Sequence, residues 1–93
     1  MAITTELAIG STEASTSTIS VPLNGVVTVG IYNTSGIITP GAIADVYIIT
    51  PAGNRFVFQL TNGLDKEAIS SVGDYIITRR STGATFGIYS YKS

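Results

Sequence analysis

Residues 42–60 read A-I-A-D-V-Y-I-I-T-P-A-G-N-R-F-V-F-Q-L, which is two runs of strand-forming residues on either side of a turn. Val, Ile, Tyr and Phe predominate in both runs, and such side chains fit a pleated, partly buried surface. In the turn, Pro51 presets its φ angle, while Gly53 and Asn54 tolerate a positive one. The stretch predicts a β-hairpin, and we expect the rest of the chain to be arranged around it.

Alternation along this hairpin divides its side chains between two faces. One face is apolar and is expected to point into the core: Val46, Ile48, Phe56, Phe58 and Leu60. The other face is mixed: Asp45, Tyr47, Ile49, Arg55, Val57 and Gln59. Its apolar members form a candidate patch, which either contacts a partner or is covered by another part of the same chain.

Two more pairs of strands are predicted on either side of the central hairpin. Residues 18–23 and 26–32 flank Asn24-Gly25, and this dipeptide is a strong hairpin signal because both residues accept a positive φ. Residues 74–80 and 85–91 flank a turn at 81–83. The connections at 33–41 and 61–73 are predicted as loops, and the second has room for a short strand near 68–72.

This pattern shows no helical periodicity and predicts an all-β fold, a single small antiparallel β-sandwich or jelly roll of about six to eight strands. Beyond the hairpin, the expected core residues are Val27, Val29, Ile31, Tyr75, Ile77, Phe86 and Ile88. Residues 1–17 begin with a short apolar alternation and continue as a Ser/Thr/Ala tract, which buries too little apolar surface to order itself. We therefore expect a flexible N-terminal arm at 1–17, able to become a strand over 3–9 if an edge is offered, and a domain at 18–93. A plain disordered terminus is the alternative.

Composition argues against several classes of partner. The 93 residues include five basic and six acidic side chains, for a net charge of −1. The sequence therefore lacks the excess of basic residues that would predict nucleic-acid binding. No apolar run approaches the length of a membrane span, and the start M-A-I-T-T-E lacks the basic region of a signal peptide. We expect no membrane partner, and synthesis without Sec export or removal of a leader.

Catalytic groups are scarce. The chain has no histidine and no cysteine, which removes the commonest general base, thiol nucleophiles and most zinc ligands. Asp45 and Asp74 stand near strand starts and are a candidate pair of glycosidase carboxylates, although solvated turn residues are the plainer interpretation. The D-K-E run at 65–67 lacks the spacing of a calcium loop, and Arg79 and Arg80 point to opposite faces of a strand. We expect no enzymatic activity, no cofactor and no metal site.

Three segments resemble small β-sandwich proteins of tailed bacteriophage heads: V-Y-I-I-T-P-A-G-N-R-F-V-F at 46–58, V-G-D-Y-I-I-T-R-R at 72–80 and F-G-I-Y-S-Y at 86–91. In that family a strand leads into a P-D-G-like turn and an aromatic-bearing strand, and a G-x-Y-R-V-like strand follows. Pro51-Ala52-Gly53 and residues 73–76 stand in the matching places. The resemblance implies a capsid decoration or cement protein, a structural protein of the virion. Such a protein would be made in the host cytoplasm, bind the major capsid protein on the outside of the head and stabilise the shell.

The large apolar side chains exceed what one small core needs, so we expect a homo-oligomer, and the resemblance implies a trimer. The expected subunit interface draws on Tyr32, Tyr47, Ile49, Val57, Tyr89 and Tyr91. The expected capsid contacts in the arm are Ile3, Leu7 and Ile9. The alternative function is a carbohydrate-binding or adhesin-like sandwich whose exposed tyrosines stack on sugars, and the sequence does not distinguish the two.

Overall fold

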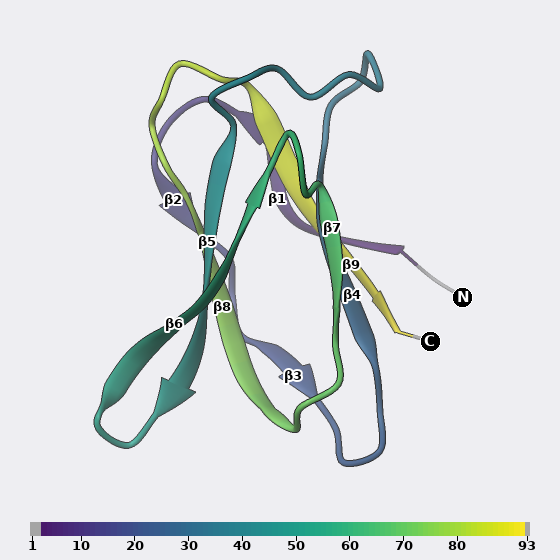
Figure 1. The fold of residues 1–93 in the computed structure, drawn as a ribbon, viewed down its shortest axis with the longest axis vertical. Coiled ribbons are helices and arrows are strands. Elements are labelled where there is room, and N and C mark those ends of the chain that lie inside the picture. The colour runs from purple at the N-terminus through teal and green to yellow at the C-terminus, as the bar shows by residue number, and fades with distance from the viewer. Residues whose placement is uncertain (1–2, 93) are drawn as a thin grey trace.

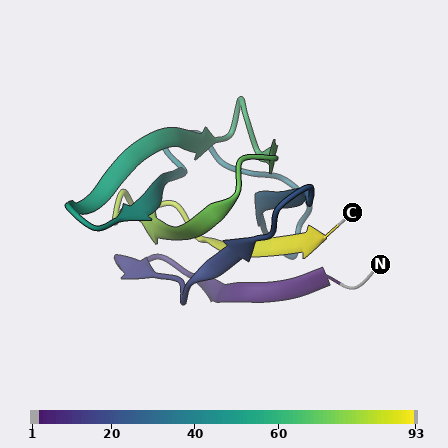
Figure 2. The ribbon, with the colours of Figure 1, turned by 90° about the horizontal axis from the view of Figure 1, so that it is seen from below.

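The computed structural model describes residues 3–92, which form two antiparallel sheets packed face to face (Figures 1 and 2). The four-stranded sheet has the order β1 (Ile3–Gly10), β9 (Phe86–Lys92), β4 (Val27–Tyr32), β7 (Lys66–Ile69). The five-stranded sheet has the order β2 (Ala14–Ser15), β8 (Gly73–Arg79), β5 (Ile43–Thr50), β6 (Gly53–Thr61), and β3 (Ile19–Val21) also pairs with β8. The predicted all-β sandwich is confirmed. Within residues 3–92, no helix is long and apolar enough to cross a membrane.

The central hairpin is confirmed as β5 and β6, which pair from Ile43 opposite Thr61 to Thr50 opposite Gly53. Gly53 has a φ of 115°, so the turn needs a residue that tolerates this region. Strand β8 pairs with β5 only as far as Ile48 opposite Tyr75. The tip of the hairpin therefore projects beyond its neighbour, at the lower left of Figure 1.

A β-bulge in β6 overturns one core prediction. Val46 lies opposite Phe58 and the next residue, Tyr47, lies opposite Phe56, so Val57 is an extra residue in β6. The extra residue breaks the alternation, and Phe56 joins the outward face of Tyr47, where 53% of it is exposed. The prediction that Phe56 belongs to the core is wrong, because a strict period of two does not survive a bulge.

The prediction that the two flanking pairs of strands form hairpins is also wrong, although the strands themselves exist. Strands β3 and β4 belong to different sheets, since β3 pairs with β8 and β4 pairs with β7 and β9. A type I′ turn needs a positive φ at both central residues, and here Asn24 has a φ of 62° while Gly25 donates its amide to the carbonyl of Pro22. The chain thus makes an arch between the sheets. The segment at 80–85 likewise connects β8 in one sheet to β9 in the other.

Two segments expected as loop or arm form strands. The 61–73 connection contains β7, which pairs with β4 and begins two residues earlier than the strand anticipated near 68–72. Residues 3–10, expected within a flexible arm, form β1 along β9, with register shifts on either side of Leu7. Strand β9 offers the free edge that an isolated sequence pattern could not reveal. Thr16 is also buried, and its hydroxyl accepts the amide of Ile77 at 3.1 Å.

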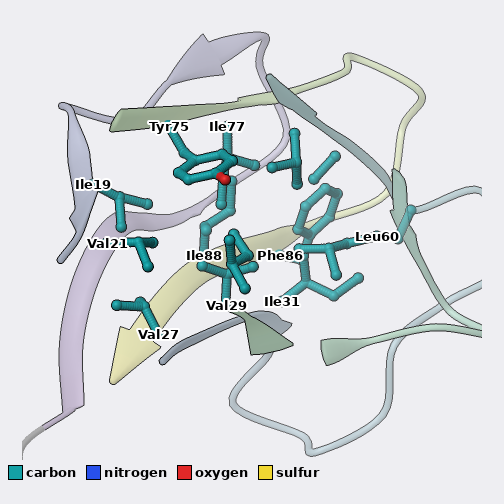
Figure 3. Close-up of a cluster of buried hydrophobic side chains, with 14 of the residues drawn as sticks. Ile19, Val21, Val27, Val29, Ile31, Leu60, Tyr75, Ile77, Phe86 and Ile88 are labelled. Carbon is teal, nitrogen blue, oxygen red and sulfur yellow. The ribbon is translucent and has the colours of Figure 1, made fainter. Parts of the chain in front are cut away.

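The core fills the space between the sheets (Figure 3). Val27, Val29 and Ile31 of the four-stranded sheet lie across from Tyr75 and Ile77 of the other. The remaining predicted core residues that are buried are Val46, Leu60, Phe86 and Ile88, while Ile48 and Phe58 are partly buried against them. Each fully buried aliphatic or aromatic side chain contributes about 1.5–3 kcal/mol of transfer free energy, so this cluster is the main source of stability.

Candidate interaction surfaces

Three tyrosine side chains lie on the solvent-facing side of the four-stranded sheet, on its two central strands, β4 and β9. We call Tyr32, Tyr89 and Tyr91 the tyrosine face. The rings of Tyr89 and Tyr91 are nearly parallel, at 9° with centroids 6.3 Å apart, and Tyr32 meets Tyr89 edge to face at 6.0 Å. Offset-parallel and edge-to-face arrangements are the favourable ones for aromatic pairs, so the three rings hold one another in place.

Glycines make room for these rings. Gly30 lies directly opposite Tyr89, and a Cβ atom there would approach the Tyr89 ring to 2.6 Å. Gly87 lies opposite Tyr32, and a Cβ atom there would lie 2.6 Å from that ring and 2.7 Å from the carbonyl oxygen of Leu7. At Gly30 the group that approaches closely is therefore an aromatic ring rather than another backbone.

A hollow of about 340 Å³ opens on the tyrosine face, lined by Ile3, Thr5, Tyr32, Lys66, Tyr89 and Tyr91. Ligand pockets in proteins begin at about this volume. Burial raises the pKa of Tyr89 above its ordinary value, and the negative charges of ionised Tyr91 and of Asp65 raise it further. Tyr89 therefore stays a neutral hydrogen-bonding group near pH 7.

The other apolar surface surrounds the projecting hairpin. We call Tyr47, Ile49, Phe56 and Val57 the hairpin patch; the last three are 40%, 53% and 43% exposed. Tyr47 packs edge to face on Phe56 with centroids 6.1 Å apart. The six residues expected to form one interface thus divide between two sheets, with Tyr32, Tyr89 and Tyr91 on one and Tyr47, Ile49 and Val57 on the other.

A polar cluster adjoins the hairpin patch on the same sheet. Asp45 is only 3% exposed, yet Arg80 Nε donates to its Oδ2 at 2.6 Å and Gln59 Nε2 donates to its Oδ1 at 2.9 Å. The hydrogen bond and the charge of Asp45 raise the pKa of Arg80 above its ordinary value. These contacts satisfy the buried carboxylate and hold β5 to β6 and to the end of β8.

The structure does not bring Asp45 and Asp74 together. Asp45 lies opposite Thr78, four residues from Asp74 along β8, which places the two aspartates roughly 13 Å apart at about 3.3 Å per residue. Asp74 instead accepts the hydroxyl of Ser20 at 2.9 Å. Among residues 3–92, no group of three or more His, Cys, Asp or Glu side chains is placed to hold a metal ion. Asp65, in the 65–67 run, is exposed.

A second hollow, of about 530 Å³, lies where the sheets separate beside β3. Its lining is largely hydroxylic and charged, and Ser90 donates a hydrogen bond to Glu6 within it. Tyr91 lines both this hollow and the one on the tyrosine face. Ser90 is buried in β9 and Glu6 lies in the neighbouring strand β1, so this hydrogen bond stabilises the pairing of the two strands.

The residues expected as capsid contacts have different environments. Ile3 is 69% exposed, Leu7 packs against the core, and Ile9 is half-buried. Leu23 and Val72 are 75% and 56% exposed, and they lie in the loops at the lower end of the sandwich in Figure 1. Neither Leu23 nor Val72 was predicted from the sequence as a contact residue. Their only signal is a large apolar residue within a Pro-, Gly- or Ser-rich connection.

Arg79 occupies the gap between the sheets at the opposite end. It is 4% exposed and donates to the main-chain carbonyls of Thr12, Ala8 and Phe86, each at 2.8 Å. Its guanidinium also lies 6.0 Å from the centre of the Phe86 ring. The predicted division of Arg79 and Arg80 between two faces is therefore confirmed, with Arg79 inside and Arg80 outside.

A scan against protein-family models and a search of curated protein sequences found no match. Among solved structures, the chain is similar to the SPBc2 prophage-derived protein YomS, with a TM-score of 0.69. The match has 11% sequence identity and covers 99% of this chain and 92% of that protein. At this identity the likeness shows a shared fold across the whole described sandwich.

Proposed function

We propose that this chain is a structural protein of a bacteriophage virion, a decoration or cement protein that binds the outside of the head and stabilises the shell. The observation that carries the proposal is that a prophage-derived protein has the same fold over nearly the whole of both chains. The major capsid protein is the proposed partner, and the protein is made in the host cytoplasm and ends on the capsid surface.

The distribution of exposed apolar groups supports action by surface burial. An oligomeric cement protein contacts both its own copies and the shell, and separate apolar surfaces fit these two tasks. The hairpin patch is the proposed contact between copies. Leu23 and Val72 at the loop end are the proposed shell contact, together with Ile3, because Leu7 is occupied in the core.

The test is addition of purified protein to heads of the encoding phage assembled without it. We expect saturable co-sedimentation with the heads and a higher temperature of shell disruption. Leu23→Asp with Val72→Asp should abolish binding, since a charge on each loop cannot be desolvated at an apolar contact. Ser81→Asp, at the other end of the sandwich, is the matched control. Heads that gain no protein at saturating concentration would rule the proposal out.

We further propose that the protein has no catalytic turnover, since Asp45 is occupied by Arg80 and Gln59 and lies far from Asp74. A screen with glycoside and ester substrates should show no hydrolysis above buffer. Hydrolysis that disappears in Asp45→Asn or Asp74→Asn, with circular dichroism unchanged, would contradict this.

A further inference from the structure

The arrangement of residues across the tyrosine face suggests a binding site beyond the proposed structural role. Two cross-strand rows run over this surface. Ile3, Tyr91 and Thr28 form one row, and Thr5, Tyr89, Gly30 and Lys66 form the next. Because Gly30 has no side chain, the Tyr89 ring extends over β4 toward Lys66. The hollow is thus made of aromatic surface bordered by a threonine hydroxyl, three phenol groups and an ammonium group.

The position of the rings excludes an extended peptide added as a strand. Tyr32 lies on β4, and Tyr89 and Tyr91 lie on β9. Both strands have neighbours on either side, so an extended peptide cannot pair with them as an added strand. A ligand that lies on the three rings is therefore bound through side chains.

The charge of the residues that line the hollow limits the class of ligand further. Of the residues that line the hollow, only Lys66 is charged. One ammonium group disfavours a cationic ligand and is too little to neutralise the successive phosphates of a nucleic acid. Neutral or acidic ligands remain.

A sugar ring has the matching chemistry, since its C–H surfaces are apolar while its rim carries hydroxyl groups. Tyrosine presents the same combination, with an apolar ring and a polar tip, and each phenol both donates and accepts. The parallel rings of Tyr89 and Tyr91 offer two adjacent platforms, which favours a chain of sugars over a single one.

We propose that the tyrosine face binds a neutral or acidic oligosaccharide. Its sugar rings lie against Tyr89 and Tyr91, and its hydroxyl or carboxylate groups bond to Lys66 and Thr5. Of the three residues in the proposed shell contact, only Ile3 borders this site, and Leu23 and Val72 do not line it.

The test is NMR titration of the isotopically labelled chain with cellohexaose, maltohexaose, the hexamer of N-acetylglucosamine, and hexagalacturonate. At least one is expected to give saturable shifts at the amides of Gly30, Lys66, Tyr89 and Tyr91. Tyr91→Ala should weaken that binding by about tenfold, or about 1.4 kcal/mol. Tyr91→Phe should retain most of the affinity, because it keeps the ring.

Tyr47→Ala, on the other sheet, is the matched control and should bind as the unmodified protein does. Lys66→Gln should weaken hexagalacturonate more than a neutral sugar, if both bind. No shift at these amides with any of the probes at millimolar concentration would overturn the proposal. So would binding that Tyr91→Ala leaves unchanged in a folded variant. A proline-rich peptide is titrated in parallel, and shifts at the same amides from the peptide alone would assign the face to peptide recognition instead.

Discussion

Arg79 shows how a single residue can join the two sheets of a small sandwich. Its guanidinium donates hydrogen bonds to the carbonyl groups of Ala8 in β1 and Phe86 in β9. It also donates to the carbonyl group of Thr12, in the connection that leads from β1 to β2 in the other sheet. A guanidinium presents five donors in a fixed fork, so it can satisfy several carbonyls at once. A buried charge satisfied by main-chain acceptors is hard to replace, because its removal leaves those acceptors without a donor.

We predict that Arg79→Met lowers the free energy of unfolding by about 3 kcal/mol, since methionine fills much of the space but donates nothing. Urea denaturation measures this as a lower midpoint at an unchanged slope. Arg55→Met is the matched control, because Arg55 is exposed. Equal midpoints for the two variants would show that the guanidinium contributes little to stability.

Tyr89 gives a prediction about alkaline pH. An unfolded tyrosine ionises near pH 10, and burial raises the folded pKa of Tyr89 above its ordinary value. The folded state then holds this proton more tightly, so its contribution to stability is complete below about pH 10 and is lost as pH rises through the folded pKa. Tyr89→Phe should therefore show a smaller loss of stability than the unmodified protein between pH 7 and about 10.5 in urea denaturation. An identical alkaline decline in both proteins would contradict the prediction.

At the scale of elements, the N-terminal strand decides whether the four-stranded sheet is complete. Strand β1 covers the free edge of β9, contributes Leu7 to the core and provides one acceptor for Arg79. The register shifts in β1 show that its pairing with β9 is irregular, as expected for a segment whose apolar alternation is short. The strand is therefore stabilised mainly by its tertiary contacts, because its local strand propensity is weak.

We predict that deletion of residues 1–10 destabilises the fold by several kcal/mol, which corresponds to a fall in melting temperature of at least about 10 °C for a domain of this size. Thermal denaturation followed by circular dichroism is the measurement. Ile3→Ser is the control, and its effect should stay within about 0.5 kcal/mol because Ile3 is 69% exposed. An unchanged melting temperature after deletion would mean that the segment is the dispensable arm that the sequence suggested.

At the scale of the molecule, the sandwich measures 34 × 32 × 20 Å with a radius of gyration of 12.5 Å. A single domain of this length is expected to have about 12 Å, so the core needs no second chain to close it. Large apolar groups nevertheless remain outside, in the hairpin patch and the tyrosine face. Burying a few hundred Å² of such surface per subunit contributes several kcal/mol at about 25 cal/mol per Å², before the cost of association.

We predict that the protein is a homo-oligomer, a trimer by resemblance to phage decoration proteins, and that its subunits meet through the hairpin patch. Sedimentation equilibrium at micromolar concentration should return a multiple of the 9.7 kDa chain mass. Tyr47→Asp with Ile49→Asp should reduce it to the monomer, because two carboxylates cannot be buried there unpaired. Tyr32→Asp with Tyr91→Asp, on the other sheet, should leave the mass unchanged. The reverse outcome for the two pairs would assign the interface to the tyrosine face.

The sequence by itself determined the fold class, the central hairpin and most of the core. Strand propensity and alternation are local properties, so Val29, Ile77 and Phe86 could be assigned to the interior before any contact was known. The outward direction of Tyr89 and Tyr91 follows from the same alternation.

Only the tertiary structure decided which strands pair. A strand next to a turn can fold back on its neighbour or cross to the facing sheet, and the choice depends on burying both sheets at once. The chain crosses at 22–26 and at 80–85, so Tyr75 faces Val29 across the core although the sequence suggested that each belonged to a hairpin. The bulge at Val57 and the pairing of Ile3 with Tyr91 arise in the same way, because both depend on contacts between residues that the local pattern does not connect.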